Sequence, residues 1–259
     1  MTDSPKWLLD LVCFCETYDL ELRHIANVIN TPKVIPMIRG KSFEFSVKDK
    51  LFSILPEDRW AITNPYMNAQ TGLHDVDVLI SSKTSNKIFS VECKLSSKGS
   101  FRFTNSRVGI KVKCMRSRTL GIEAATSRAR QTGLQIDALM THNDQYRPED
   151  FDLVITSLAN AFYSTNEDGV FFWDPPLTAE TFLNTLNIHN HGEAFQKMYV
   201  ARSKDIAACS NTNIRCTRSK CKNSDCRFIP NYPSIEFNLN TGAPNAPWVP
   251  IEKIENLLD

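Results

Sequence analysis

Two short apolar arms joined by a polar turn decide the fold of this chain: Leu73-His74-Asp75-Val76-Asp77-Val78-Leu79-Ile80 and Ile88-Phe89-Ser90-Val91-Glu92-Cys93-Lys94-Leu95. Both arms are rich in Val, Ile and Leu or Phe, and they are bounded by Gly72 and by the Ser- and Asn-containing stretch 81–86. This composition is typical of strands and their turns. We therefore predict a β-hairpin whose turn is centred between Thr84 and Ser85.

The register of that hairpin gathers polar side chains on one face. Side chains alternate between the faces of a strand, and directly opposed residues of an antiparallel pair point to the same side. The predicted register sets Asp77 opposite Glu92, with Lys94 on the same face. Two neighbouring carboxylates repel each other unless a cation lies between them, and Mg²⁺ prefers oxygen ligands. The alternative interpretation is a solvated hairpin face that carries an ion pair.

A predicted helix over residues 39–55 precedes the hairpin. At about 100° per residue, its apolar side chains form one wide arc: Phe43, Phe45, Val47, Leu51, Phe52, Ile54 and Leu55. Glu44 falls near the middle of this arc. A carboxylate on a buried stripe is costly unless it is paired or faces a cation. Pairing with Lys48, one turn further on, would be a purely structural explanation.

Taken together, these residues resemble the PD-(D/E)xK nuclease core, over about residues 39–95: Arg39-Gly40-Lys41-Ser42-Phe43-Glu44, Asp77 and Glu92-Cys93-Lys94. The resemblance implies an α/β (α+β) fold with a restriction-endonuclease-like core, in which helices flank a central mixed β-sheet. It implies that the helix bearing Glu44 packs beside this sheet, whose second and third strands carry Asp77 and the Glu92–Lys94 pair. No proline precedes Asp75 or Asp77, so the choice between them stays open. We choose Asp77 because an apolar strand follows it and because it opposes Glu92.

The resemblance also implies an activity, that of a type II restriction endonuclease. Such an enzyme hydrolyses phosphodiester bonds of double-stranded DNA with Mg²⁺ and leaves 5′-phosphate and 3′-hydroxyl ends. Asp77, Glu92 and the backbone carbonyl of Cys93 would hold Mg²⁺, Lys94 would position or activate the attacking water, and Glu44 would support the site or a second metal. The alternatives are another nuclease with this core (a junction resolvase, nickase or repair endonuclease) and a non-catalytic, zinc-bearing DNA-binding protein. A homodimer is expected if the DNA site is palindromic.

Composition sets broad limits on the class of protein. The chain has 259 residues, of which 42% are hydrophobic and 23% charged, as in ordinary soluble globular proteins. No apolar run approaches the roughly 20 residues of a membrane span, so we expect no membrane association. We expect an N-terminal helical segment over 1–38 with two helices, a nuclease core with DNA-contacting insertions over 39–200, and a cysteine-rich module with a C-terminal tail over 201–259.

Positive charge is concentrated directly after the hairpin. Residues 94–130 hold ten basic side chains and one acidic side chain, a local net charge of +9 in a chain whose net charge is +1. A solvated surface is the simpler explanation of a charge run, but its position next to the predicted active site favours phosphate contact. The candidate DNA-binding residues are Lys98, Arg102, Asn105, Arg107, Lys111, Lys113, Arg116 and Arg118. A helix is predicted to follow, from about Ile122 to Leu139.

Four of the eight cysteines lie close together near the C-terminus. Cys209, Cys216, Cys221 and Cys226 have the spacing C-x6-C-x4-C-x4-C, in a stretch with few apolar residues. Four thiolates can close a tetrahedral Zn²⁺ site, or an iron site, that folds such a segment. Because we expect a reducing cytoplasm, metal binding is favoured over disulfides. Unpaired or redox-active thiols are the alternative.

Overall fold

The computed structural model describes residues 5–65, 76–104, 107–117, 119–212 and 214–258. Three residues that the sequence singles out, Asp75, Asn105 and Arg118, lie outside this part of the chain. The chain divides into two compact units, Met1–Ser42 and Phe43–Asp259. None of the helices in the described ranges is long and apolar enough to cross a bilayer.

The first unit is helical. It contains α1 (Lys6–Thr17), the short 3-10 helix η1 (Leu22–His24) and α2 (Ile25–Ile29), which confirms the two helices predicted near the N-terminus. Helix α3 (Ile35–Ile54) begins in this unit, and from Phe43 onward it belongs to the second unit.

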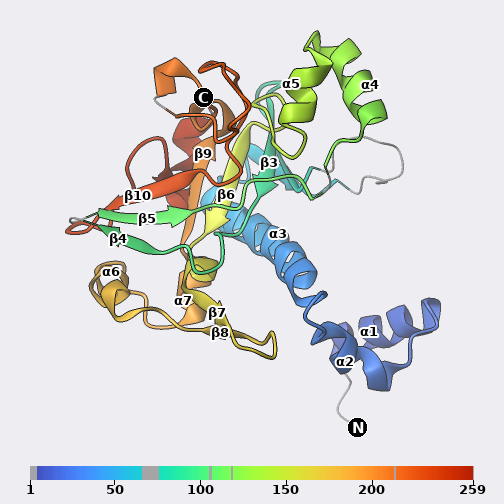
Figure 1. The fold of residues 1–259 in the computed structure, drawn as a ribbon. Helices are drawn as coiled ribbons and strands as arrows, with labels where there is room; N and C mark the ends of the chain where they lie inside the picture. Colours follow the sequence, from blue (N-terminus) through green and yellow to red (C-terminus); the bar gives the residue numbers. More distant parts are fainter. Residues whose placement is uncertain (1–4, 66–75, 105–106, 118, 213, 259) are drawn as a thin grey trace. The chain divides into compact units, whose positions relative to one another are not determined.

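A six-stranded sheet forms the centre of the second unit (Figure 1). Its order is β1 (Trp60–Thr63), β2 (Val78–Ser82), β3 (Ile88–Cys93), β6 (Leu153–Ser157), β9 (Met198–Arg202) and β11 (Val249–Pro250). The β3–β6 pair is parallel and the other four pairs are antiparallel, so the sheet is mixed as predicted. Because β6 is covered on both faces, all five of its residues are buried, including the polar Thr156 and Ser157 at its end.

The β2–β3 hairpin has the predicted register. Val78 pairs with Val91 and Ser81 with Ile88, so the turn is centred between Thr84 and Ser85. Val78, Ile80 and Val91 are fully buried. Continuing the pairing by one residue sets Asp77, which directly precedes β2, opposite Glu92 on β3.

The C-terminal part of α3 packs on one face of the central sheet. Phe43, Val47 and Leu51 are fully buried in a cluster that includes Ile80 and Val91. Two other members of the predicted arc are exposed instead: Phe45 keeps 49% and Phe52 52% of its surface. The buried stripe of the helix is therefore narrower than its apolar sequence suggests, and the prediction was wrong for these two residues.

The opposite face of the central sheet packs against a second, three-stranded sheet and the segments around it. This sheet has the order β10 (Ser234–Asn238), β5 (Arg107–Lys111) and β4 (Arg102–Thr104). Val108 and Ile110 of β5 join Val154 and Tyr199 of the central sheet in the largest apolar cluster, together with Phe237. A third, two-stranded sheet consists of β7 (Tyr163–Thr165) and β8 (Phe171–Trp173).

Short helices complete the second unit. They are α4 (Ile122–Thr132), α5 (Ile136–Thr141), α6 (Glu180–Thr185), α7 (His191–Gln196) and the 3-10 helices η3 (Ala159–Phe162), η4 (Leu177–Ala179), η5 (Ser203–Asp205), η6 (Ser210–Thr212) and η7 (Ile251–Leu257). The single helix predicted over 122–139 is wrong. Gly133 adopts a left-handed conformation with φ 71° and ends α4, and α5 begins three residues later.

The contrast along α3 can be tested by mutation. Leu51→Ala should lower the free energy of unfolding by roughly 2–5 kcal/mol, because it leaves a cavity in the core. Its exposed neighbour gives the matched control, since Phe52→Ala should cost less than about 1 kcal/mol. Urea unfolding followed by circular dichroism measures both. Equal losses for the two variants would contradict the observed orientation of the helix.

Candidate active site and metal centre

The carboxylate of Asp77 lies at the open end of the β2–β3 hairpin. Its Oδ2 atom accepts a hydrogen bond of 2.7 Å from the backbone N–H of Cys93, and its own carbonyl accepts one of 2.7 Å from the side-chain amide of Asn64. The backbone N–H of Lys94 donates to the carbonyl of Ile155 on β6 at 2.9 Å. These bonds fix the ends of both hairpin arms, and with them the carboxylate.

Glu92 is buried, with 7% of its surface exposed, and two groups contact its Oε1 atom. Lys94 Nζ lies 2.5 Å away, and the hydroxyl of Tyr146 donates a hydrogen bond of 2.9 Å. Lys94 Nζ also lies 5.5 Å from the centroid of the Tyr146 ring, within range of a cation–π contact. Tyr146, which lies 54 positions along the chain from Glu92, is thus an additional member of the polar cluster predicted at the hairpin.

Electrostatics shows that Glu44 belongs to the same group. Burial raises the pKa of Asp77 to about 8, and the negative charges of Glu92 and Glu44 add to this rise. The hydrogen bond from the Cys93 N–H and the positive charge of Lys94 act in the opposite direction and lower the pKa. Burial by itself would lower the pKa of Lys94, but the charge of Glu92 and further contributions from Tyr146 and Asp77 raise it overall. Lys94 is therefore an ammonium ion, suited to orienting water or stabilising phosphate charge rather than accepting a proton.

Ionisation of Asp77 creates repulsion with the negative charges of Glu92 and Glu44 in a buried place. A hard divalent cation would relieve it, because Mg²⁺ binds through one or two carboxylates together with waters and phosphate oxygens. Asp77, Glu92 and the carbonyl of Cys93 are the groups that would hold such an ion. The donor set fits Mg²⁺ better than a soft transition metal, since all of its atoms are oxygens.

The predicted DNA-binding residues separate into two groups. Arg107 and Lys111 are exposed on β5, on the face opposite to the buried Val108 and Ile110. Arg102 is exposed on β4 opposite Gly109, and Lys98 and Lys113 are exposed in the flanking segments. We call the exposed side chains of Arg102, Arg107, Lys111 and Lys113 the basic face; it also carries Glu236, 3.8 Å from Arg107.

Arg116 belongs to the interior rather than to this face. Its side chain is 8% exposed, and its Nη2 atom lies 2.6 Å from a carboxylate oxygen of Asp150, which also contacts Arg128. The Arg116 guanidinium lies 4.7 Å from the centroid of the Tyr146 ring. The charge of Arg116 neutralises a buried acid and its guanidinium covers the ring of Tyr146, so the prediction of a phosphate contact was wrong for this residue.

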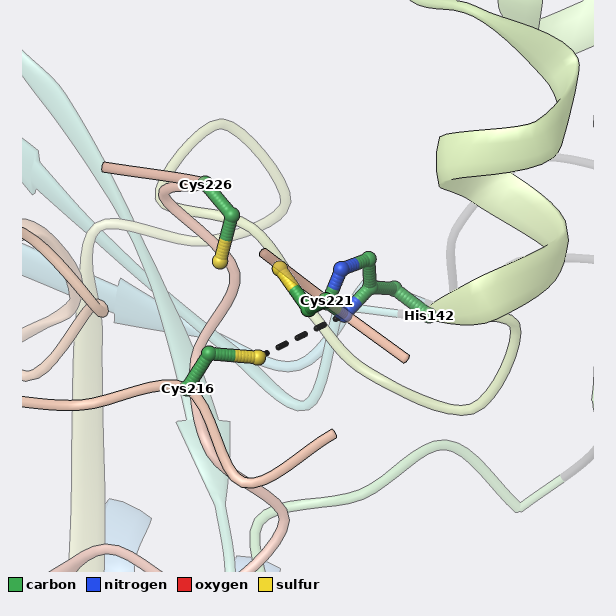
Figure 2. Close-up of side chains that lie close together, drawn as sticks. All are labelled: His142, Cys216, Cys221 and Cys226. Atoms are coloured by element: carbon green, nitrogen blue, oxygen red, sulfur yellow. Dashed lines mark hydrogen bonds between the residues drawn. The ribbon is translucent and has the colours of Figure 1, made fainter. Parts of the chain in front are cut away.

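A second cluster of ligand-type side chains lies near the end of α5 (Figure 2). One atom from each of His142, Cys216, Cys221 and Cys226 lies within 4.8 Å of the other three. Burial lowers the pKa of His142, and it raises the pKa of Cys216 and, to about 12, that of Cys226. The ring is therefore neutral, and the thiols would ionise on binding a cation. These four residues could hold a metal ion such as zinc.

Of the four cysteines predicted as ligands, Cys216, Cys221 and Cys226 lie in this cluster and Cys209 does not. Among the described residues, His142 takes the fourth place in the cluster. Cys209 instead forms an isolated β-bridge with Ile214, and its side chain hydrogen-bonds to Asp225. In the sequence, Cys209 differs from the other three cysteines in its spacing. Cys216, Cys221 and Cys226 are equally spaced as C-x4-C-x4-C, whereas six residues separate Cys209 from Cys216.

Sequence reasoning missed Tyr146 and His142. Both belong to the segment 142–150, which lacks the periodicity of a helix or strand and carries no recognisable motif.

Comparisons of the chain with protein-family models, curated proteins and solved structures found no match. The function of the chain is therefore inferred from its side chains.

The raised pKa of Asp77 predicts a pH-dependent stability. In the metal-free protein the folded carboxyl titrates at about 8, against an ordinary value of 3.8. Between these pH values the folded state holds the extra proton, so stability falls as the pH rises. Asp77→Asn removes this titration while its amide oxygen can still accept from Cys93. The free energy of unfolding of the variant should gain on that of wild type by roughly 1.4 kcal/mol for each pH unit above 4, reaching about 5 kcal/mol at pH 8, and the two should run parallel below pH 4.

Urea unfolding in a metal chelator at several pH values measures the difference. Asp168→Asn, at an exposed position in the β7–β8 turn, is the control and should follow wild type throughout. A constant difference between Asp77→Asn and wild type across the pH range would contradict the prediction.

Proposed function

We propose that this protein is a Mg²⁺-dependent, sequence-specific endonuclease of double-stranded DNA, of the PD-(D/E)xK type and specifically a type II restriction enzyme. The observation that carries the proposal is the convergence of Asp77, Glu92 and Lys94 at one end of the β2–β3 hairpin, with the charge of Glu44 acting on Asp77 from α3. The order of helix α3 and strands β1 to β3 agrees with the core that the sequence resembles.

Each side chain has a role in this reaction. Asp77 and Glu92 would hold the ion beside the scissile phosphate, and the N–H of Cys93 keeps the Asp77 carboxylate in place. When bound, Mg²⁺ would polarise the phosphate and lower the pKa of the attacking water. Lys94, as an ammonium ion, would orient this water and stabilise the charge that develops on phosphorus oxygens. In-line attack would release the 3′-oxygen and leave a 5′-phosphate.

Binding of the duplex would use the basic face. Arg102, Arg107 and Lys111 lie on paired strands, and the carbonyl of Lys111 accepts from the N–H of Ser97, three residues beyond Lys94. Backbone pairing thus connects this face to the end of the active-site strand. An extended cationic surface is what a nuclease needs to hold the phosphodiester backbone.

The proposed setting of the protein is the cytoplasm. All eight cysteines are free thiols, which supports a reducing compartment. We propose double-stranded DNA as the partner, with a homodimer if the recognition site is palindromic.

Cleavage of supercoiled plasmid tests the proposed activity. With Mg²⁺ the wild-type protein should give discrete fragments, and without a divalent ion it should give none. Asp77→Ala and Lys94→Ala should each reduce the rate by about 100-fold or more, because each removes a group that acts at the phosphate. Both should bind DNA in a chelator much as wild type does.

Variants of two exposed residues serve as controls: Glu167→Ala for Asp77→Ala, and Lys87→Ala for Lys94→Ala. Metal-dependent cutting that survives both active-site changes would refute the assigned site. Cutting only at junctions or nicks would favour a structure-specific nuclease, and binding without any cleavage would favour a zinc-bearing DNA-binding protein.

The basic face generates a separate prediction. Lys111→Ala should weaken binding to all DNA sequences alike and reduce the slope of log K against log salt by about 1. Lys87→Ala is the matched control, since this exposed lysine lies in the β2–β3 turn. Fluorescence anisotropy over a salt series measures both slopes. A slope unchanged by Lys111→Ala would remove this residue from the phosphate contacts.

A further inference from the structure

The side chains in Figure 2 come from two segments that are far apart in sequence. His142 directly follows α5, whereas the three cysteines belong to the irregular chain between η6 and β10. Three thiolates and one imidazole form a common structural Zn²⁺ set. Their spread of up to 4.8 Å is close to the roughly 3.8 Å between sulfurs around a tetrahedral zinc with Zn–S bonds of about 2.3 Å.

Hydrogen bonds around the cluster prepare its ligands. The side-chain amide of Gln145 donates to the carbonyl of Ile229 at 2.9 Å, and its oxygen lies 2.6 Å from Nδ1 of His142, which also lies 3.9 Å from the Cys216 sulfur. With the ring proton on Nδ1, this nitrogen donates to Gln145. This assignment leaves the lone pair on Nε2 for a metal. The backbone N–H of Arg218 donates to the sulfur of Cys216 at 3.4 Å, as expected where a thiolate is to be stabilised.

The cysteine-bearing segment is held by polar contacts, such as those of Arg218 with Asp144 and of Ser210 with Asp225, and not by an apolar core. Of the described residues from 209 to 227, none is fully buried, while ordering each residue costs roughly 1–2 kcal/mol of backbone entropy. A metal ion bonded to Cys216, Cys221 and Cys226 would supply the missing stabilisation.

The same cluster is connected to the candidate active site through Tyr146. The ring of His142 stacks on Phe228 at 4.0 Å, and the next residue, Ile229, donates its N–H to the carbonyl of Tyr146 at 2.8 Å. Tyr146 lies four residues after His142 and donates its hydroxyl to Glu92. The segment that carries His142 therefore includes Tyr146, and the segment that carries the cysteines is hydrogen-bonded to the backbone of Tyr146 through Ile229.

We propose that His142, Cys216, Cys221 and Cys226 bind one Zn²⁺, which clamps residues 142–150 to the segment 216–229 and thereby positions Tyr146 against Glu92. The zinc site stands independently of the nuclease proposal. The positioning of Glu92 for Mg²⁺ rests on that proposed function. In this arrangement Tyr146 is a positioning residue, which acts on the reaction through Glu92.

Metal content of the full-length, reduced protein tests the ligand set. Elemental analysis should find about one zinc per chain in wild type. Cys216→Ser and His142→Ala should lose it, whereas Cys209→Ser, the matched cysteine outside the cluster, should retain it. Absence of zinc from wild type, iron in its place, or loss of zinc from Cys209→Ser would overturn the proposed site.

Hydrogen exchange of wild-type protein before and after removal of zinc by a chelator tests the clamp without any variant. Protection should fall in peptides covering 142–150 and 216–229, and it should persist in the β2–β3 hairpin. Unchanged protection of 142–150 would overturn the clamp. Loss of protection throughout the central sheet would also overturn it, because zinc would then hold the whole core.

Positioning of Glu92 is read from the Mg²⁺ dependence of cleavage. Tyr146→Phe, and wild type stripped of zinc, should each raise the Mg²⁺ concentration for half-maximal cleavage by about 10-fold, and the two changes together should add little more. Additive effects would refute the route through Tyr146. Zinc binding and local protection without cleavage under any condition would overturn the nuclease proposal and leave the zinc clamp supported.

Discussion

The register of the β2–β3 hairpin is the constraint on which the rest of the site depends. Pairing of Val78 with Val91 fills the core on one face and sets Asp77 opposite Glu92 on the other. A slip by one residue would reverse both faces, so the apolar core and the polar cluster select the same register. The packing of α3 on this sheet then brings Glu44 close enough to raise the pKa of Asp77.

Sequence reasoning succeeded where the determinants are local. The hairpin register follows from alternation over sixteen residues and a short turn, and the buried stripe of α3 was recognised in part from its helical period. It failed for Tyr146 and His142, because nothing near them in sequence reports a partner 54 or 74 positions away. Such contacts are set by how the segment 142–150 packs against the central sheet and the cysteine-bearing chain, which no periodicity encodes.

Charge illustrates the same limit. Arg116 and Lys111 belong to the same basic run of the sequence, yet their side chains have different environments in the structure. Lys111 is exposed on an outward-facing strand position, whereas Arg116 neutralises Asp150 in the interior and covers one face of Tyr146. A buried acid needs a paired cation, so part of the apparent surface charge of residues 94–130 is consumed in stabilising the fold.

The two candidate metal centres use different chemistry for different ends. Oxygen ligands around Asp77 and Glu92 suit a hard ion that exchanges readily and keeps open positions for water and phosphate. Thiolate ligands around His142 suit an ion that stays bound and replaces a missing apolar core. Tyr146 connects the two: its hydroxyl donates to Glu92, and its carbonyl accepts from Ile229, next to the Phe228 ring that stacks on His142. An ion bound by the cysteines would therefore fix a side chain that contacts Glu92 without occupying any coordination position of an ion bound at Asp77 and Glu92.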